Sequence, residues 1–238
     1  MIDDERNDIY IHIDAKADES QFADIHASKS RLFYTNRVKV YWGNDSMIDA
    51  EYELLQAAQK QGPYLYYHLL SGVDLPLKTQ DYIHHLLDEV YRGHEFVGYS
   101  KRTDFAYRAR YYHLFDRHLR SKTKVALKLS KMRNYALILQ KKVGIWRNKN
   151  VNIVWGPQWF SITEDLCQFL LFYKKKVRNM YFMVLNPDES FIQTLVRDTR
   201  FYNYIHDKEE EYSSCMRLID WDKGPDYLHI LDFDHQTS

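Results

Sequence analysis

Short apolar segments alternate with amphipathic segments along this chain. Six apolar runs predict strands, and several are continuously apolar, as strands are when helices cover both faces of a sheet. These runs span residues 9–13, 38–42, 64–70, 95–99, 152–155 and 181–185. Strands that alternate with helices are typical of an α/β domain with a mostly parallel sheet flanked by helices.

Capping residues predict where three of the helices begin. Ser46 and Thr79 each precede a segment whose apolar residues recur every three or four positions, and both residue types favour the N-cap. Ser161 with Glu164 three residues later has the pattern of a capping box, which satisfies two backbone N–H groups at a helix start.

A further helix is expected in an unusually basic part of the chain. Residues 117–149 contain eleven Lys and Arg and no Asp or Glu. Apolar residues recur there at alternating spacings of four and three, which predicts a basic amphipathic helix: Val125, Leu129, Met132, Ala136, Leu139 and Val143. Such a helix either packs on the core, which is the commoner case, or attaches to an anionic membrane surface or a polyanionic substrate.

Composition narrows the class of protein. With 238 residues, 45% of them hydrophobic and 28% charged, the chain can fold as one domain over residues 1–238. The 33 basic and 33 acidic residues cancel, which argues against nucleic-acid binding. Cys167 and Cys215 form no CxxC pair, so a disulfide framework or thiolate metal site is not expected. Without a signal-peptide pattern, we expect a cytoplasmic protein, with peripheral contact at the inner face of an anionic membrane as an option.

Polar and aromatic side chains follow the predicted strands. Ligands bind beyond the carboxyl ends of strands in open α/β sheets, and carboxylates, cations and rings collect there, as a sugar joined to a phosphate would require. Asp74, in Ser71-Gly72-Val73-Asp74, has a turn-stabilising role as its alternative. The group comprises Asp14, Asp74, Lys101, Arg102, Trp159 and Glu189.

Five motifs follow one another in an order that carries a resemblance. They are Tyr10-Ile11-His12-Ile13-Asp14, Trp42-Gly43 before Ser46-Met47, Leu70-Ser71-Gly72-Val73-Asp74-Leu75-Pro76-Leu77, Gly156-Pro157-Gln158-Trp159-Phe160 and Pro187-Asp188-Glu189. Over nearly the whole chain this series resembles glycosyltransferase family 14, and the bacterial branch most. That family includes the core-2 and I-branching β-1,6-N-acetylglucosaminyltransferases and the peptide O-xylosyltransferases. The resemblance implies a GT-A-like, Rossmann-type fold.

The resemblance also implies a reaction. It is the inverting, metal-independent transfer of N-acetylglucosamine from UDP-GlcNAc to a glycan hydroxyl in β-1,6 linkage, in cell-surface polysaccharide synthesis. Transfer from UDP-xylose and an inactive module that binds nucleotide or carbohydrate remain open. The family's catalytic base falls on Glu189. Asn186 as N-cap and Pro187 at the first helical position would place this carboxylate in a first turn, where acids are also common as simple partners of the helix dipole.

The departing diphosphate needs positive charge, from a metal ion or from Lys and Arg. The Asp-x-Asp triplets at 220–222 and 232–234 lie late in the chain, and we do not expect them to bind metal; no cofactor beyond the UDP-sugar is expected. By resemblance, donor contacts are expected at Asp14, Arg217 and Lys223. Sugar or acceptor contacts are expected at Asp74, Trp159, Lys101, Arg102, Arg108 and Arg110.

Two family features are missing from the sequence. Members normally carry a strand and a helix before the motif at Tyr10, and a basic element after a segment like residues 231–233. We therefore expect a sheet without the family's first strand and a donor site without its clamp lysine. Whether the chain is active, which donor and acceptor it uses, and its oligomeric state are left open.

Overall fold

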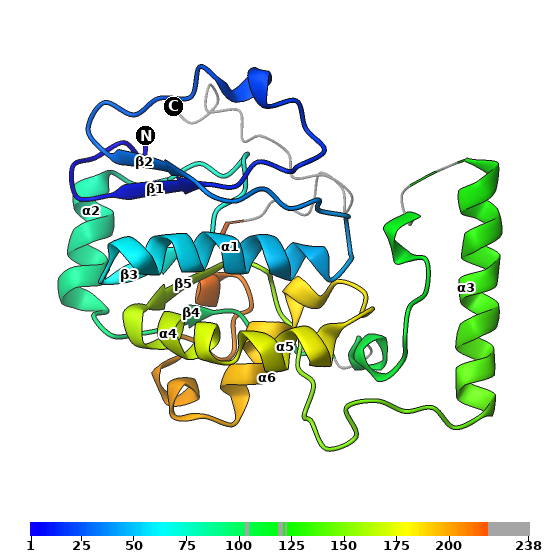
Figure 1. Ribbon diagram of the computed structural model, residues 1–238. Coiled ribbons are helices and arrows are strands. Elements are labelled where there is room, and N and C mark those ends of the chain that lie inside the picture. The colour runs from blue at the N-terminus through cyan, green and yellow to red at the C-terminus, as the bar shows by residue number, and fades with distance from the viewer. Residues whose placement is uncertain (103–104, 119–120, 122, 219–238) are drawn as a thin grey trace, which may run out of the picture.

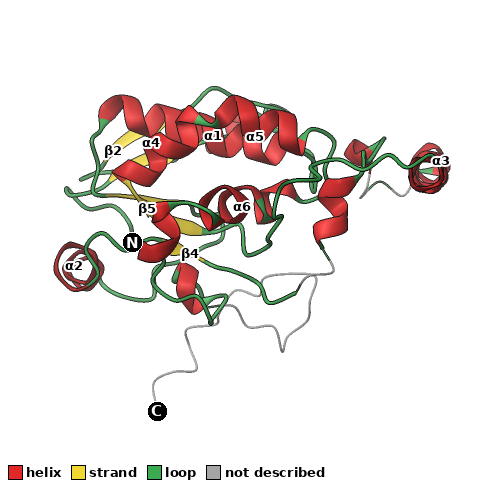
Figure 2. Cartoon of the chain, turned by 90° about the horizontal axis from the view of Figure 1, so that it is seen from below, coloured by secondary structure: helices red, strands yellow, loops and turns green. Residues whose placement is uncertain are grey.

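The computed structural model describes the chain except residues 103–104, 119–120, 122 and 219–238 (Figure 1). Helices α1 (Ser46–Gln61), α4 (Glu164–Phe172) and α5 (Lys174–Tyr181) form one layer beside the strands, at the top of Figure 2. Helix α6 (Phe191–Arg197) lies below that layer. The predicted α/β class is confirmed.

The described strands form two small sheets. Strand β1 (Asp8–Ile11) pairs in parallel with β2 (Arg31–Tyr34). In the second sheet, β5 (Phe160–Thr163) lies between β3 (Tyr66–His68) and β4 (Phe96–Val97) and runs antiparallel to both. The direction expected for a mostly parallel sheet is therefore corrected for this second sheet. A continuous apolar run indicates that a strand is buried on both faces. A central antiparallel strand covered by helices is buried in this way too, so the run does not reveal the strand's direction.

The predicted strand positions are only partly right. The predicted run 9–13 overlaps β1, and the runs 64–70 and 95–99 contain β3 and β4. The runs 38–42 and 152–155 are irregular segments, and α5 occupies the start of 181–185. Their apolar side chains are still needed in the interior: Ile153 and Trp155 are buried. Burial without a partner strand gives the same sequence pattern as a strand.

Of the three predicted caps, only Thr79 is correct, although all three helices begin close to the predicted positions. The Thr79 hydroxyl accepts from the Tyr82 amide at the start of α2 (Gln80–His85), as predicted. α4 is capped by Thr163 instead of Ser161, because Ser161 belongs to β5 and its hydroxyl contacts His68 at 2.7 Å. α1 begins at Ser46, although its N-cap is Asp45.

One hydrophobic core joins the helical layer to the second sheet. Tyr52 of α1, Leu166 and Leu170 of α4, Phe160 of β5 and Phe191 of α6 are almost completely buried in it. The Tyr52 hydroxyl donates to the Leu170 carbonyl at 3.2 Å. This hydrogen bond joins α1 to α4 within the core.

Helix α3 (Lys124–Lys142) forms where the basic amphipathic pattern predicts it. It stands apart from the layered body, at the right of Figure 1. Among its residues, only Ala126 and Gln140 are buried. The commoner expectation, a helix packed along its apolar stripe on the core, is therefore wrong: Val125, Met132 and Leu139 are exposed. In the described part of the chain, no helix combines the length and apolar character needed to cross a membrane.

Candidate active site

The Pro-Asp-Glu motif forms a turn in front of α6. Residues Pro187–Glu189 make one 3-10 turn, and Ser190 separates it from α6. The continuous helix expected from Asn186 and Pro187 is therefore corrected. The break follows from Ser190, whose φ of −148° and ψ of −30° are not helical and whose hydroxyl donates to the Val154 carbonyl at 2.8 Å. Asn186 is left-handed with φ of 46°, which asparagine tolerates better than most residues.

The Glu189 carboxylate is held by three groups. Its Oε2 accepts from the Trp155 indole N–H at 3.0 Å and from the Asn186 amide at 3.3 Å. A guanidinium nitrogen of Arg108 lies 3.9 Å from the same oxygen. The side chain is still 37% exposed. Within the described residues the recorded contacts all reach Oε2, which leaves Oε1 as the oxygen able to receive a proton.

Aromatic rings frame the cation beside Glu189. The Arg108 guanidinium lies 4.3 Å from the Phe105 ring centre and 5.6 Å from that of Trp155. These two rings stack with centres 5.8 Å apart. The Arg102 guanidinium lies 4.4 Å from the Phe105 ring. Such contacts hold a cation in place at a partly desolvated site. The positive charge of Arg108 therefore lies against the aromatic rings and faces the Glu189 carboxylate.

Asp188 differs from Glu189 in its surroundings. It is 3% exposed, and its Oδ1 has no hydrogen-bond partner among the described residues. Burial, followed by the charge of Glu189, raises the pKa of Asp188 to about 7. Burial and the charge of Asp188 also raise the pKa of Glu51, on α1, well above its usual value. A shielded carboxyl that holds its proton is a poor base for an incoming substrate, which favours Glu189 over Asp188.

This buried carboxyl pair predicts a pH-dependent stability. The unfolded chain releases the Glu51 proton near pH 4.3, whereas the folded chain holds it to higher pH. The free energy of unfolding should therefore fall as the pH rises above about 4. We expect Glu51→Gln to melt about 2–4 °C above the wild type at pH 8. At pH 5 the difference should be smaller, which melting curves at the two pH values would measure.

The exposed carboxylate Glu5 supplies the control for this pair. Glu5→Gln should melt like the wild type at both pH values, because it changes an exposed side chain outside the core. An equal gap at pH 5 and pH 8 for Glu51→Gln would mean that Glu51 does not titrate as described.

A second group of predicted residues meets near the Ser71–Asp74 turn. The Arg217 guanidinium donates to the Leu69 carbonyl at 2.7 Å and to the carbonyls of Cys215 and Met216. Burial lowers the pKa of Arg217, and the negative charge of Asp74 partly offsets this decrease. Asp74 also accepts from the Ser71 amide at 2.7 Å, so the turn-stabilising alternative is observed. Arg217 and Asp74 are thus brought together, and their ligand roles remain predictions.

The other predicted residues lie in separate places. Asp14 accepts from the amides of Lys16 and Val40, and Lys101 pairs with Glu209 at 3.3 Å. Trp159 is half-buried, and its indole N–H has no partner among the described residues. Arg110 donates to the carbonyls of Asn148 and Val151, which gives it a structural task in this loop.

Some predicted site residues and motifs fall outside the described residues. These are Lys223 and the triplets at 220–222 and 232–234. Within the described part, no three His, Cys, Asp or Glu side chains are grouped so that they could hold a metal ion.

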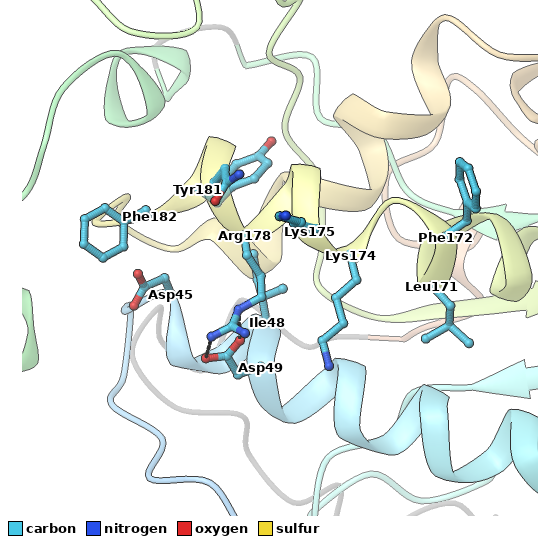
Figure 3. A pocket seen from close by; sticks show the side chains of 11 residues that line it. Asp45, Ile48, Asp49, Leu171, Phe172, Lys174, Lys175, Arg178, Tyr181 and Phe182 are labelled. Carbon is cyan, nitrogen blue, oxygen red and sulfur yellow. Dashed lines mark hydrogen bonds and ion pairs between the residues drawn. The ribbon is translucent and has the colours of Figure 1, made fainter.

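A shallow hollow lies on the outer face, between α1 and α5 (Figure 3). Asp49 and Arg178 point toward each other there and pair at 2.9 Å. Lys174 reaches toward α1, where it pairs with Glu53 at 3.6 Å. Its charges largely satisfy one another, and its lining includes none of the predicted site residues.

Sequence reasoning missed Trp155 and Phe105 as parts of the site. Trp155 directly precedes the Gly156–Trp159 motif, so its position next to a family motif was the available signal. Phe105 carried no signal, because its contact with Trp155 depends on how the loop folds back.

One family model matches almost the whole chain. It is described as Branch, Core-2/I-Branching enzyme, and it covers residues 1–235. A search of curated proteins returns no significant match.

Proposed function

Because the chain belongs to the Core-2/I-Branching enzyme family, we propose that it transfers N-acetylglucosamine from UDP-GlcNAc to a glycan hydroxyl with inversion, without a metal ion. The family establishes a glycosyltransferase of the core-2/I-branching type. The donor, the β-1,6 linkage, the metal independence and a role in cell-surface polysaccharide synthesis are the proposed part.

The observation that carries the proposal is the half-exposed Glu189 carboxylate. Its Oε2 is fixed by Trp155 and Asn186, while Arg108 lies 3.9 Å away. A carboxylate whose orientation is fixed on one oxygen can use the other as a general base. The cation stabilises the negative charge that this role requires before proton transfer.

The proposed step is a single displacement. Glu189 takes the proton of the acceptor hydroxyl as that oxygen attacks the anomeric carbon of the sugar. The bond from that carbon to the diphosphate breaks on the opposite face, and its electron pair leaves with UDP. The product has the inverted, β configuration, and Glu189 returns its proton to solvent.

Charge on the departing UDP would be met by the cationic side chains of Arg and Lys. Arg217 is the described candidate, with Asp74 beside it, and Lys223 is the candidate outside the described residues. Hydrogen bonds from charged donors contribute about 1.5–3 kcal/mol each. Two or three of them would supply much of what a metal ion provides.

Calorimetric titration followed by a UDP-release assay tests the proposal. UDP-GlcNAc and UDP-xylose would be compared as donors, each with and without a glycan acceptor. We expect UDP-GlcNAc to bind and to be turned over. Turnover with UDP-xylose instead would support the xylosyltransferase alternative. Binding of a UDP-sugar without turnover would support the inactive module. No binding of either UDP-sugar would contradict the proposed transfer and its xylosyltransferase alternative.

Metal removal gives a separate prediction. We expect the UDP-release rate in EDTA to stay within about twofold of the rate with added Mg²⁺ or Mn²⁺, because cationic side chains take the place of the ion. Initial rates at saturating donor measure this. Loss of activity in EDTA that Mn²⁺ restores would overturn the metal-independent mechanism and leave the family assignment unaffected.

A further inference from the structure

Helix α3 presents a large apolar surface away from the protein. Its exposed apolar side chains are Val125, Leu127, Met132, Tyr135, Ile138 and Leu139. Exposed apolar residues are common singly, but six of them on one 19-residue helix are not. This helix stands apart from the layered body (Figure 1), so no described helix or strand covers these side chains.

The side of α3 that faces the protein is defined by contacts. Ala126 and Gln140 are the buried residues of the helix. The Gln140 amide accepts from the Tyr112 N–H at 2.8 Å and donates to the Tyr112 carbonyl at 2.9 Å. Gln140 therefore ties the helix to the preceding loop, and the opposite side faces outward.

The outward side mixes apolar residues with lysines. At about 3.6 residues per turn, Tyr135, Ile138 and Lys131 lie nearly opposite Ala126 and Gln140. Lys124, Lys128 and Lys142 share this sector, and Lys124–Lys142 contains six basic residues and no acid. Long lysine stems lie along apolar surface while the ammonium groups stay in water. A face of this kind suits a boundary between water and hydrocarbon.

We propose that α3 is an interfacial helix that lays this protein on an anionic lipid bilayer. Lysines would meet the negatively charged headgroups, and the exposed apolar side chains on either side of them would enter the boundary of the acyl chains. Trp146, shortly after the helix, is 46% exposed, and tryptophan favours this depth. The proposal does not depend on the proposed reaction.

Charge decides between a bilayer and other occupants. If α3 packed on α3 of a second copy, the lysines of both helices would face each other across the contact, which costs free energy. A nucleic acid or a soluble acidic glycan would satisfy the lysines and leave the exposed leucine, isoleucine and valine side chains in water. An anionic bilayer satisfies both kinds of side chain.

Vesicle co-sedimentation tests the proposal. The full chain would be spun with vesicles of phosphatidylcholine mixed with phosphatidylglycerol, and with vesicles of phosphatidylcholine alone. We expect binding to the mixed vesicles that weakens with salt, together with a blue shift of tryptophan fluorescence. The double variant Leu127→Asn, Ile138→Asn should bind the mixed vesicles at least about tenfold more weakly than the wild type. The double variant Lys128→Glu, Lys131→Glu should lose a similar amount of binding.

Matched variants elsewhere keep the test specific. Lys175→Glu with Lys176→Glu, on exposed positions of α5, makes the same charge change. Val73→Asn with Val90→Asn removes two exposed apolar side chains from other parts of the chain. Both control pairs should bind vesicles like the wild type. Because all these positions are exposed, melting temperatures should stay close to that of the wild type.

Three outcomes would overturn the proposal. The first is equal vesicle binding by the α3 variants and the control variants. The second is a dimer in vesicle-free buffer that Leu127→Asn, Ile138→Asn dissociates, which would assign the face to a second copy. The third is binding to soluble dextran sulfate that only the lysine variant weakens, with no binding to vesicles.

Discussion

Glu189→Gln is expected to lower the rate of sugar transfer by about 10²- to 10⁴-fold, the usual contribution of a general base. Glutamine has the same shape, and its amide oxygen can still accept from the Trp155 N–H at the position of Oε2. It cannot take a proton from the acceptor hydroxyl. We therefore expect the fold to be retained, donor binding to stay close to wild type and kcat to carry the loss.

Three measurements separate this loss from damage to the site. Calorimetry with UDP-GlcNAc should give a similar affinity for the variant and the wild type, and the melting temperature should be unchanged within about 2 °C. Glu5→Gln, an exposed position, should retain full activity. Wild-type turnover by Glu189→Gln would remove Glu189 as the base, and Asp188 would then be the next carboxyl to test.

The sequence was sufficient for the features that local chemistry decides. The caps and the spacing of apolar residues placed α2 and α3 correctly, because both depend on neighbours a few residues away. The order of short motifs predicted the family and pointed to Glu189. Its role as base remains a prediction, which the contact with Arg108 supports.

Long-range contacts decide what the sequence left open. Whether β5 runs parallel or antiparallel to its neighbours depends on the path of the connections, since apolar content is the same in both cases. The pairing of Arg108 with Glu189 crosses 81 positions of the chain, and no local pattern encodes it. The apolar stripe of α3 predicted a helix but not whether the body would cover it.

Gly156→Ala is the second large expected effect, and it links the fold to the site. A Cβ at Gly156 would lie 2.0 Å from the Gly98 carbonyl oxygen and 2.9 Å from its carbon. Gly98 is equally confined, since a Cβ there would lie 2.1 Å from the Glu211 carbonyl oxygen. At both glycines the added Cβ would collide with backbone atoms, and the clash cannot be relieved by moving a flexible side chain. We expect the free energy of unfolding to fall by about 3 kcal/mol or more.

The displaced backbone would also disturb Glu189, the proposed catalytic base. The Gly156 N–H donates to the Glu189 carbonyl at 2.9 Å, and the adjacent Trp155 holds the Glu189 side chain. A shift at Gly156 therefore moves the hydrogen bond to the Glu189 carbonyl and the Trp155 indole at the same time. We expect a melting temperature about 6–12 °C lower and a lower kcat even in the fraction that remains folded, because a displaced base loses its alignment with the acceptor.

Gly72→Ala is the matched control, because no atom lies within 4 Å of a Cβ at that glycine. Thermal melts of both variants, with UDP release measured well below the lower melting temperature, would separate stability from alignment. Gly72→Ala should melt within about 2 °C of the wild type. Equal melting of Gly156→Ala and the wild type would show that the two backbones do not approach as closely as described. A destabilised but fully active Gly156→Ala would show that Glu189 is aligned by Asn186 and Arg108 without the Gly156 hydrogen bond.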